Sequence, residues 1–552
     1  MDDHRRDRSI VWTPLFFSIV LTAGMILGFN LRETLRNKRD IGTVIQRNDR
    51  LEEIIDLVND KYVDSINSNR LYNDAVNGIL HSLDPHTIYI PADQLQGVND
   101  DLEGGFSGIG VEFSILNDTI DVTSVIDDGP AHKAGIVTGD QLLMVGDSLV
   151  AGNGITPDRI THLLRGKQKT AVLLTLKQPD SSAIRRVEVV RDIVPLYSID
   201  AAIMLDDATG YIKINRFSAT TAKEFKAGLE KLVNRGAKQM IVDLRENPGG
   251  YLDAATSIAD QFLSDNKLIV YTQGSRTPKT EYRAGDQGLF EKGRVAVLVD
   301  EGSASAAEIL AGALQDWDRA VIVGRRTYGK GLVQEQYEMP DGAALRLTVA
   351  KYYTPSGRCI QRSFAKGKEE YQADYRHRFE SGELTGNEAA YVADTTRYYT
   401  SKNRIVYGGG GIQPDVYVPY DTSKYPGAVI DLVFNNEFKN AVWEYYMHNR
   451  SELRYRDFSD FEQSFDDQAG IEAIYLSGMN AAKRKAVVKL LAGKNNRDYF
   501  DVQAKAQLAR VMYKDNGYFT ISMKADHMVG KAREILGSDQ YLKLIEGKPG
   551  KP

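Results

Sequence analysis

The sequence predicts a mixed α/β protein of several domains, and three observations predict it. At 552 residues the chain is too long for one hydrophobic core. Between residues 194 and 424, apolar strand-like runs alternate with helical patterns, which is typical of an α/β domain. The flanking segments differ: 41–99 is helical, 100–193 is rich in short strands and glycine turns, and 425–552 is helical and charged. We therefore expect a central α/β domain between a helical module, a β-rich domain and a helical extension.

Composition excludes several classes of function. The net charge of -6 argues against nucleic acid as a standing partner. The single cysteine, Cys359, allows no intramolecular disulfide and no cysteine-based structural zinc site. The eight histidines are scattered without the HExxH spacing, so neither a zinc hydrolase nor a Ser-His-Asp triad is favoured. We expect no metal and no cofactor.

The N-terminus predicts a membrane anchor. Residues 10–29 carry no charge, about the length that spans the ~30 Å hydrocarbon layer. Arginines precede this run, which places residues 1–9 in the cytoplasm by the positive-inside rule. No small-x-small cleavage site follows the run, so we expect an uncleaved anchor. The remaining chain would then lie outside the cytoplasmic membrane of a bacterium, in the periplasm or cell envelope.

Hydrophobic periodicity places the elements in order. The helical module has apolar residues at helical spacing, Leu51, Ile54, Ile55 and Val58, and a second helix over 71–83. Proline at position 85 disfavours helix at the preceding residue and ends it. The β-rich domain has strand-like runs at 111–113, 120–122 and 171–174 and a short helix over 157–164.

The α/β domain has two near-continuous apolar runs, 239–244 and 295–300, as expected for strands covered on both faces. Helices are predicted over 222–234, 254–263 and 304–315. A polar insertion rich in tyrosine and glutamate, at about 364–401, is interpreted as a surface excursion.

A serine at a strand-to-helix turn is the first candidate for chemistry. Within residues 300–308 a buried strand ends, a turn of small residues follows, and a helix begins. Such a turn would expose the hydroxyl of Ser305, and the helix N-terminus offers free N–H groups to an oxyanion. The alternative is that Ser305 and Glu308 form only a capping box. Taken alone, Ser305 is interpreted as a helix cap.

Two further segments favour a nucleophile. Lys330 lies between Gly329 and Gly331, just after a strand, and a lysine acts as general base when burial lowers its pKa. Its alternative is an exposed lysine in a turn; the phosphate-loop pattern is not met. The turn Gly249-Gly250 follows another sheet strand, where it can aim backbone N–H groups into a cleft.

In this order the motifs resemble the carboxyl-terminal processing peptidases, also called tail-specific proteases, over about residues 45–420. The matching segments are 83–87, 106–111, 127–136, 139–143, 247–250, 303–308 and 328–331. The resemblance implies a crotonase/ClpP-like α/β peptidase core with an inserted PDZ domain of β-sandwich or barrel type at 100–193. The insertion at 364–401 and the extension after 425 depart from the common pattern, which leaves access to the cleft and the oligomeric state open.

The resemblance also implies a serine peptidase with a Ser-Lys dyad. Ser305 matches the nucleophile and Lys330 the general base, Gln334 matches the glutamine that orients the lysine, and Asp316 matches an acidic residue of some members. An acyl-enzyme would form and be hydrolysed. The oxyanion would be stabilised by the backbone N–H groups of Gly249, Gly250 and Ala306.

The implied PDZ domain suggests how substrates are selected. An extended C-terminus would add to it as a strand, with its carboxylate bound by the N–H groups of Gly108, Ile109, Gly110 and Val111. Partners would be proteins or peptides with accessible C-termini, and in the family PDZ occupation can also gate the active site. A homo-oligomer or an adaptor is left open. The rival hypothesis is a catalytically silent, membrane-bound PDZ scaffold.

Overall fold

The computed structural model describes residues 50–179, 183–285, 287–386, 396–420 and 427–546. The chain divides into two compact units, Met1–Ile79 and Leu80–Pro552. The predicted anchor at 10–29 lies outside the described residues. Among the helices within the described ranges, none is both long and apolar enough to span a membrane.

Two helices confirm the periodicity read at the start of the helical module. They are α2 (Arg50–Lys61) and α3 (Ser68–His81). No residue of α2 is buried, and Leu51, Ile54 and Leu57 are exposed. After α3 the chain turns at Asp84, whose Oδ1 accepts hydrogen bonds from the N–H groups of His86 (2.9 Å) and Thr87 (3.0 Å). This Asx-type turn leads into β1 (Ile88–Ile90) and α4 (Ala92–Glu103).

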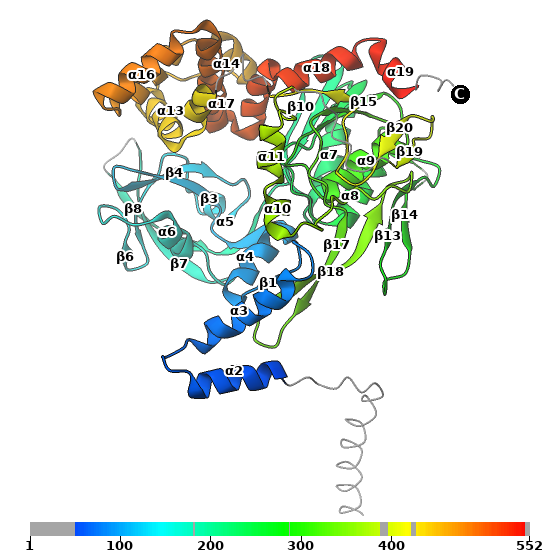
Figure 1. The fold of residues 1–552 in the computed structure, drawn as a ribbon. Coiled ribbons are helices and arrows are strands. Elements are labelled where there is room, and N and C mark those ends of the chain that lie inside the picture. Colours follow the sequence, from blue (N-terminus) through cyan, green and yellow to red (C-terminus); the bar gives the residue numbers. More distant parts are fainter. Residues whose placement is uncertain (1–49, 180–182, 286, 387–395, 421–426, 547–552) are drawn as a thin grey trace, which may run out of the picture. The chain divides into compact units, whose positions relative to one another are not determined.

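A small β domain follows, at the place predicted for the β-rich segment (Figure 1). Its elements are β2 (Gly105–Gly108), β3 (Val111–Leu116), β4 (Thr119–Val125), α5 (Pro130–Lys133), β5 (Gln141–Val145), β6 (Ser148–Leu149), α6 (Pro157–Leu164), β7 (Ala171–Lys177), β8 (Ile184–Val190) and β9 (Asp192–Pro195). The sheet runs β3-β4-β5-β7-β8, with β6 beside β5, while β2 pairs with β9. Ile160 and Leu164 of α6 are buried in its core. Because β3 is the last strand of this sheet, one of its edges has no strand partner among the described residues.

The α/β core is built on a six-stranded sheet in the order β10-β11-β12-β15-β16-β21. These strands are β10 (Ile199–Met204), β11 (Thr209–Ile214), β12 (Gln239–Asp243), β15 (Arg294–Val299), β16 (Val321–Gly324) and β21 (Val416–Tyr417). All neighbours are parallel except β10 and β11. One face packs against α7 (Thr221–Asn234), α8 (Leu252–Ala259) and α9 (Ala306–Asp316). The predicted strands and helices of this domain are confirmed to within a few residues.

The other face of this sheet is covered by α18 (His527–Leu536) and α19 (Gln540–Ile545). Val529 and Ile535 are fully buried against sheet residues such as Ile241. Arg294 Nη1 also donates to the carbonyl oxygens of Leu536 (2.6 Å) and Ser538 (2.8 Å). The last helices of the extension predicted at 425–552 therefore complete an α/β/α sandwich.

The earlier part of the extension has its own hydrophobic core. It contains α12 (Gly427–Phe434), α13 (Asn436–Asn449), α14 (Phe458–Ser464), α15 (Gln468–Ser477), α16 (Ala481–Leu491) and α17 (Lys494–Ala525). This helical bundle contacts the β domain, where the indole N–H of Trp443 donates to Asp121 Oδ2 (3.0 Å). Helix α17 is interrupted at Lys514, which has a φ of 60°.

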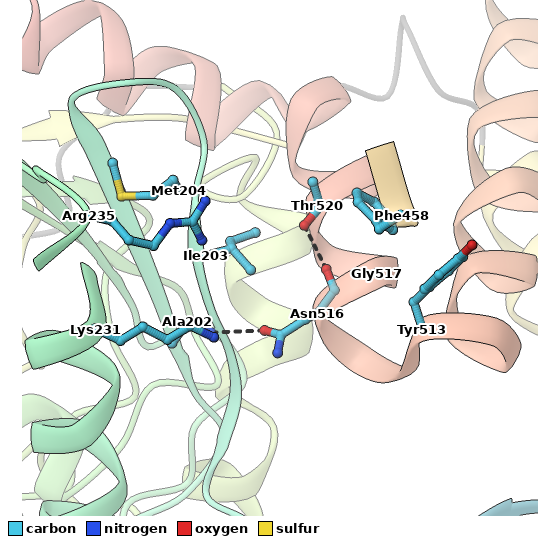
Figure 2. A pocket seen from close by; sticks show the side chains of 10 residues that line it. All are labelled: Ala202, Ile203, Met204, Lys231, Arg235, Phe458, Tyr513, Asn516, Gly517 and Thr520. Atoms are coloured by element: carbon cyan, nitrogen blue, oxygen red, sulfur yellow. Dashed lines mark hydrogen bonds between the residues drawn. The ribbon is translucent and has the colours of Figure 1, made fainter. Parts of the chain in front are cut away.

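Beyond that interruption, α17 lies along the edge strand β10, where Asn516 Oδ1 accepts a hydrogen bond from Ala202 N–H (3.2 Å). A cavity of about 380 Å³ opens between α17 and β10 (Figure 2). None of the predicted catalytic residues lines it. The cavity is therefore separate from the candidate chemistry.

A second, antiparallel sheet stands beside the core in the order β1-β18-β13-β14, with β17 paired to β18. It contains β13 (Leu268–Gln273), β14 (Thr280–Arg283), β17 (Leu332–Glu338) and β18 (Ala344–Tyr353). The predicted insertion forms α10 (Lys368–Gln372), α11 (Asp374–Glu380) and β19 (Arg397–Tyr399), which pairs with β20 (Ile405–Tyr407). Most residues of α10 and α11 are exposed, as expected for a surface excursion, but not all of them are.

Candidate active site

Ser305 sits between the end of β15 and the first residue of α9. Its backbone has a φ of 54°, in the left-handed region that costs a non-glycine residue about 1–2 kcal/mol. Such strain is retained where the surrounding structure enforces it, and it recurs at functional sites. The predicted strand-turn-helix is confirmed, and the serine stands partly exposed at its tip.

Glu308, one turn into α9, holds Ser305 and Lys330 by their backbones. Its Oε2 accepts hydrogen bonds from the N–H groups of Ser305 (2.9 Å) and Lys330 (2.8 Å). Its Oε1 accepts from Thr327 Oγ1 (2.5 Å) and from Gly329 N–H (2.7 Å). The side chain is fully buried, and burial raises the pKa of Glu308 against the opposing effect of these hydrogen bonds. The glutamate expected as half of a capping box is thus also a bridge to the Lys330 loop.

Tyr352, on β18, reaches the same two residues from their carbonyl side. Its hydroxyl lies 3.0 Å from Ser305 O and 2.8 Å from Lys330 O. The ring is buried in the main hydrophobic core, and burial raises its pKa well above the ordinary value. The hydroxyl therefore keeps its proton and remains a donor near both carbonyl groups.

Lys330 lies in the loop between β16 and β17, where Gly329 has a φ of 87°. Its Nζ donates to Gln334 Oε1 (2.9 Å), so the structure brings together the predicted base and the glutamine predicted to orient it. Burial lowers the pKa of Lys330 below its ordinary value, and the nearby charge of Arg346 lowers it further. Among the described residues, no hydrogen bond joins Lys330 Nζ to the Ser305 hydroxyl.

Gln334 is itself held by the turn after the first helices. Its Nε2 donates to the carbonyl oxygen of His86 (2.5 Å). Burial, followed by the charge of Lys330, lowers the pKa of His86 to about 4, so the ring is neutral near pH 7. The segment around Asp84 therefore contributes directly to the site, whereas the sequence pattern alone assigned it only the end of a helix.

The glycine turn lies against the nucleophile. At Gly249, which has a φ of 93°, an added Cβ would lie 2.8 Å from Ser305 Cβ. The Gly249 N–H already donates to Asn247 Oδ1 (2.8 Å). A bridge to Phe217 uses the carbonyl of Gly249 and the N–H of Tyr251, which directs the Gly250 N–H away from Phe217.

Two N–H groups near Ser305 remain available for an oxyanion. Gly250 N–H and Ala306 N–H have no hydrogen-bond acceptor within the described part of the chain. Ala306 is the first residue of α9, where the N–H groups have no partner inside the helix. Of the three groups expected to form the oxyanion hole, these two are the better candidates, because that of Gly249 is already engaged.

Asp316 is not with the other site residues. It ends α9, and its carboxylate pairs with Arg358 at 2.7 Å, with both side chains fully buried. It also accepts from the N–H (3.0 Å) and hydroxyl (2.7 Å) of Ser356. These contacts indicate a structural role, since Asp316 supports the segment that follows β18.

The predicted peptide-binding loop joins β2 to the edge strand β3. The carbonyl groups of Ile109 and Gly110 accept hydrogen bonds from Ala131 N–H (2.7 Å) and Ile126 N–H (3.1 Å). Within the described ranges the N–H groups of Ile109 and Gly110 have no acceptor. Unengaged N–H groups beside a free strand edge are what capture of a C-terminus requires.

Two site residues were given no role by sequence reasoning: Tyr352 lies in no matching segment, and His86 lies in the matching segment 83–87. Glu308 did carry a signal: it is a charged residue in a helix that is otherwise apolar except near its end. A buried carboxylate must find hydrogen-bond donors, and its position one turn from the serine could have indicated them.

The known proteins that this chain resembles are proteases. The model of peptidase family S41 matches residues 208–370. A carboxy-terminal-processing protease of Bartonella bacilliformis is 36% identical over 351 residues, covering 62% of this chain and 77% of the relative. A probable CtpA-like serine protease of Staphylococcus epidermidis is 33% identical over 314 residues, covering 56% of this chain and 62% of the relative.

Among solved structures, the photosystem II D1 C-terminal processing protease aligns with 27% identity and a TM-score of 0.31, covering 56% of this chain and 88% of that one. A PDZ domain of a carboxy-terminal protease from Vibrio cholerae aligns with 25% identity and a TM-score of 0.16, covering 17% and 99%.

The α/β core carries a serine at a strand-to-helix turn and is joined to a small β domain, and the similarity to these proteases shows that the protein is a serine protease. More particularly, the chain belongs to peptidase family S41, the family of the carboxy-terminal-processing proteases.

Proposed function

We propose that the protein is a membrane-anchored serine endopeptidase that uses Ser305 and Lys330 to cut cell-envelope proteins or peptides near their C-termini. One observation supports this assignment above the others. Glu308 and Tyr352 fasten the serine and the lysine to each other by their backbones, although they come from different loops. An ordinary helix cap does not need a partly buried lysine held beside it.

In the proposed reaction, neutral Lys330 accepts the hydroxyl proton as Ser305 Oγ attacks the substrate carbonyl. The oxyanion of the tetrahedral intermediate is stabilised by Gly250 N–H and Ala306 N–H. Lys330 then returns the proton to the leaving amine, which departs and leaves an acyl-enzyme on Ser305. Water, deprotonated by Lys330, releases the acyl group and restores the serine.

Activity measured on a quenched fluorescent peptide with an apolar C-terminus tests the dyad. Ser305→Ala and Lys330→Ala are expected to abolish cleavage, whereas Lys485→Ala, which removes an exposed lysine on α16, leaves it unchanged. Cleavage that persists in both active-site variants would refute the assignment. A wild-type protein that binds the peptide without cutting it would favour the silent scaffold instead.

The pH profile tests the base separately. Because burial lowers the pKa of Lys330, the neutral amine becomes abundant at lower pH than for an ordinary lysine near 10.5. kcat/KM is therefore expected to rise along a limb whose pKa lies well below that value. A limb that appears only at the ordinary pKa of lysine would contradict the proposed general base.

The PDZ role and the anchor need their own tests. A peptide with a free C-terminal carboxylate should bind more tightly than the same peptide with an amidated C-terminus, because the loop of Ile109 and Gly110 offers N–H groups to a carboxylate. Full-length protein should sediment with membranes, and a variant without residues 1–30 should not. Equal binding of both peptides, or soluble full-length protein, would remove the corresponding part of the proposal.

A further inference from the structure

Several side chains of the insertion at 364–401 are buried, and two of them lie near the Lys330 loop. Tyr371 of α10 and Arg378 of α11 are each only 3% exposed. Their neighbours Tyr375 and Phe379 are 53% and 52% exposed. Tyr371 and Arg378 therefore dock the helices of the insertion close to the Lys330 loop.

Arg378 binds the chain just before the catalytic lysine. Its Nη2 donates to the carbonyl oxygen of Arg326 (2.6 Å), and its Nη1 donates to that of Thr327 (3.4 Å). Glu383, at the far end of the insertion helices, accepts hydrogen bonds from both Arg378 (3.1 Å) and Arg326 (2.8 Å). The segment that leads into Lys330 is thus held by the insertion.

Tyr371 binds the other side of the same loop. Its ring lies 3.8 Å from the guanidinium of Arg362, which also lies 4.3 Å from the ring of Tyr328. The backbone N–H of Arg362 in turn donates to the carbonyl oxygen of Gly329 (3.0 Å). The Tyr371 hydroxyl lies 2.9 Å from Nε2 of His86, and the two rings meet edge to face.

From His86 a continuous path of hydrogen bonds reaches the lysine. The carbonyl of His86 accepts from Gln334 Nε2 (2.5 Å), and Gln334 Oε1 accepts from Lys330 Nζ (2.9 Å). Each link therefore fixes the orientation of the next. Tyr371 is the one member of this path that the insertion contributes.

We infer that Tyr371 is a positioning residue for the reaction: by holding His86 it fixes Gln334, and through Gln334 it aims the amine of Lys330. This inference rests on the proposed role of Lys330 as general base. It assigns the insertion a function, since docking of α10 completes the support of the base. The Tyr371 ring also covers the loop and excludes water from it.

The protonation states of the pair fit this arrangement. Burial lowers the pKa of His86 to about 4, so near pH 7 its ring is neutral and has one nitrogen that can accept a hydrogen bond. Burial raises the pKa of Tyr371 to about 12, so its hydroxyl keeps the proton that it donates.

Two substitutions separate the hydroxyl from the ring. Tyr371→Phe keeps the ring against Arg362 but loses the bond to His86, and we expect kcat to fall about threefold to tenfold with KM little changed. Tyr371→Ala also admits water to the loop. Its kcat should therefore fall further than that of Tyr371→Phe, and the acid limb of its pH–rate profile should move to higher pH. Tyr375→Phe, which alters an exposed tyrosine of α11, is the matched control and should match the wild type.

A double-mutant cycle identifies the path. If Tyr371 acts through His86, adding Tyr371→Phe to His86→Ala should lower kcat little further. The inference is overturned if Tyr371→Phe keeps the wild-type kcat, or if the effects of the two substitutions on kcat multiply in the double variant. Thermal unfolding of each variant shows that the folded protein is being assayed.

The same assays separate this inference from the proposed function. Loss of activity in Ser305→Ala and Lys330→Ala together with a normal Tyr371→Phe would overturn only the role of Tyr371. Activity that survives in both active-site variants would overturn the dyad itself, whatever the Tyr371 variants do.

Discussion

Glu308 and Tyr352 bind the same two residues from opposite sides. The carboxylate of Glu308 accepts hydrogen bonds from the backbone N–H groups of Ser305 and Lys330. The hydroxyl of Tyr352 lies within hydrogen-bonding distance of the backbone carbonyl oxygens of the same two residues. The relative position of Ser305 and Lys330 is therefore set by main-chain contacts. Within the described part of the chain the side chains of Ser305 and Lys330 share no hydrogen bond, and the Lys330 amine donates to Gln334.

Replacing Glu308 should damage both stability and rate. In Glu308→Gln one acceptor oxygen is replaced by an amide that faces two donors, so about half of its hydrogen bonds are lost. The free energy of unfolding should fall by about 1–3 kcal/mol, and kcat should fall by at least tenfold because the two loops lose their common anchor. Urea unfolding and peptide cleavage measure these effects. Glu230→Gln, an exposed position on α7, should change neither; a Glu308→Gln variant as active as the wild type would remove the bridge from the mechanism.

The glycine turn gives a matched pair of substitutions. Gly249 and Gly236 both have a φ of 93°, but an added Cβ meets nothing within 4 Å at Gly236. At Gly249 it would lie 2.6 Å from Ala304 O and 2.8 Å from Ser305 Cβ. Gly236→Ala should cost only the left-handed strain of about 1–2 kcal/mol and keep its activity.

Gly249→Ala should have the same backbone strain and should also displace Ser305, so that cleavage is lost even where the variant remains folded. Circular dichroism confirms folding, and steady-state cleavage gives the rate. Similar activity in the two variants would show that the turn does not need to lie this close to Ser305.

Asp316 should prove to be structural. Asp316→Asn leaves the buried guanidinium of Arg358 without its counter-charge, which typically destabilises a protein by about 3–5 kcal/mol. Molecules that remain folded should cleave peptide at nearly the wild-type kcat. The measurement is cleavage rate divided by the folded fraction, taken from urea unfolding under the same conditions. A deficit that persists after this correction would return Asp316 to the active site.

The low pKa of His86 makes stability depend on pH. The unfolded chain takes up a proton near the ordinary value of 6.5, whereas the folded protein does so only near 4. Between these values the unfolded state binds more protons, so stability falls as the pH drops from about 6.5 to about 4 and levels off below. The contribution is at most about 3 kcal/mol, and less because the ring is partly exposed.

His86→Gln should flatten this part of the stability curve, as followed by urea unfolding at a series of pH values. A wild type and variant with parallel curves would show that His86 titrates normally in the folded protein.

The elements around Ser305 could be predicted because the local sequence itself changes from the apolar run of a buried strand to the pattern of a helix. The role of Glu308 could not be predicted from the sequence, since its partners Thr327 and Gly329 lie 19 and 21 residues away and no periodicity connects them. Tyr371 was missed for the same reason, because His86 lies 285 residues from it. Local patterns report which residues are buried, but not which distant group each buried polar atom will meet.

The helical extension shows the same limit. Amphipathic spacing indicates helices throughout 425–552, yet α13 packs within a separate bundle and α18 packs on the central sheet. Both apolar faces look alike in sequence. The surface that each covers is decided by tertiary shape, which the pattern does not encode.

The cover that α18 and α19 place over the central sheet has a consequence for biosynthesis. Asp206, beside the edge strand, pairs with Arg533 of α18 across 327 residues of chain. One face of the sheet stays bare until α18 and α19 have been synthesised, and such distant contacts form slowly. A ribosome-bound chain therefore carries Ser305 and Lys330 on an unfinished scaffold until most of the polypeptide has been made.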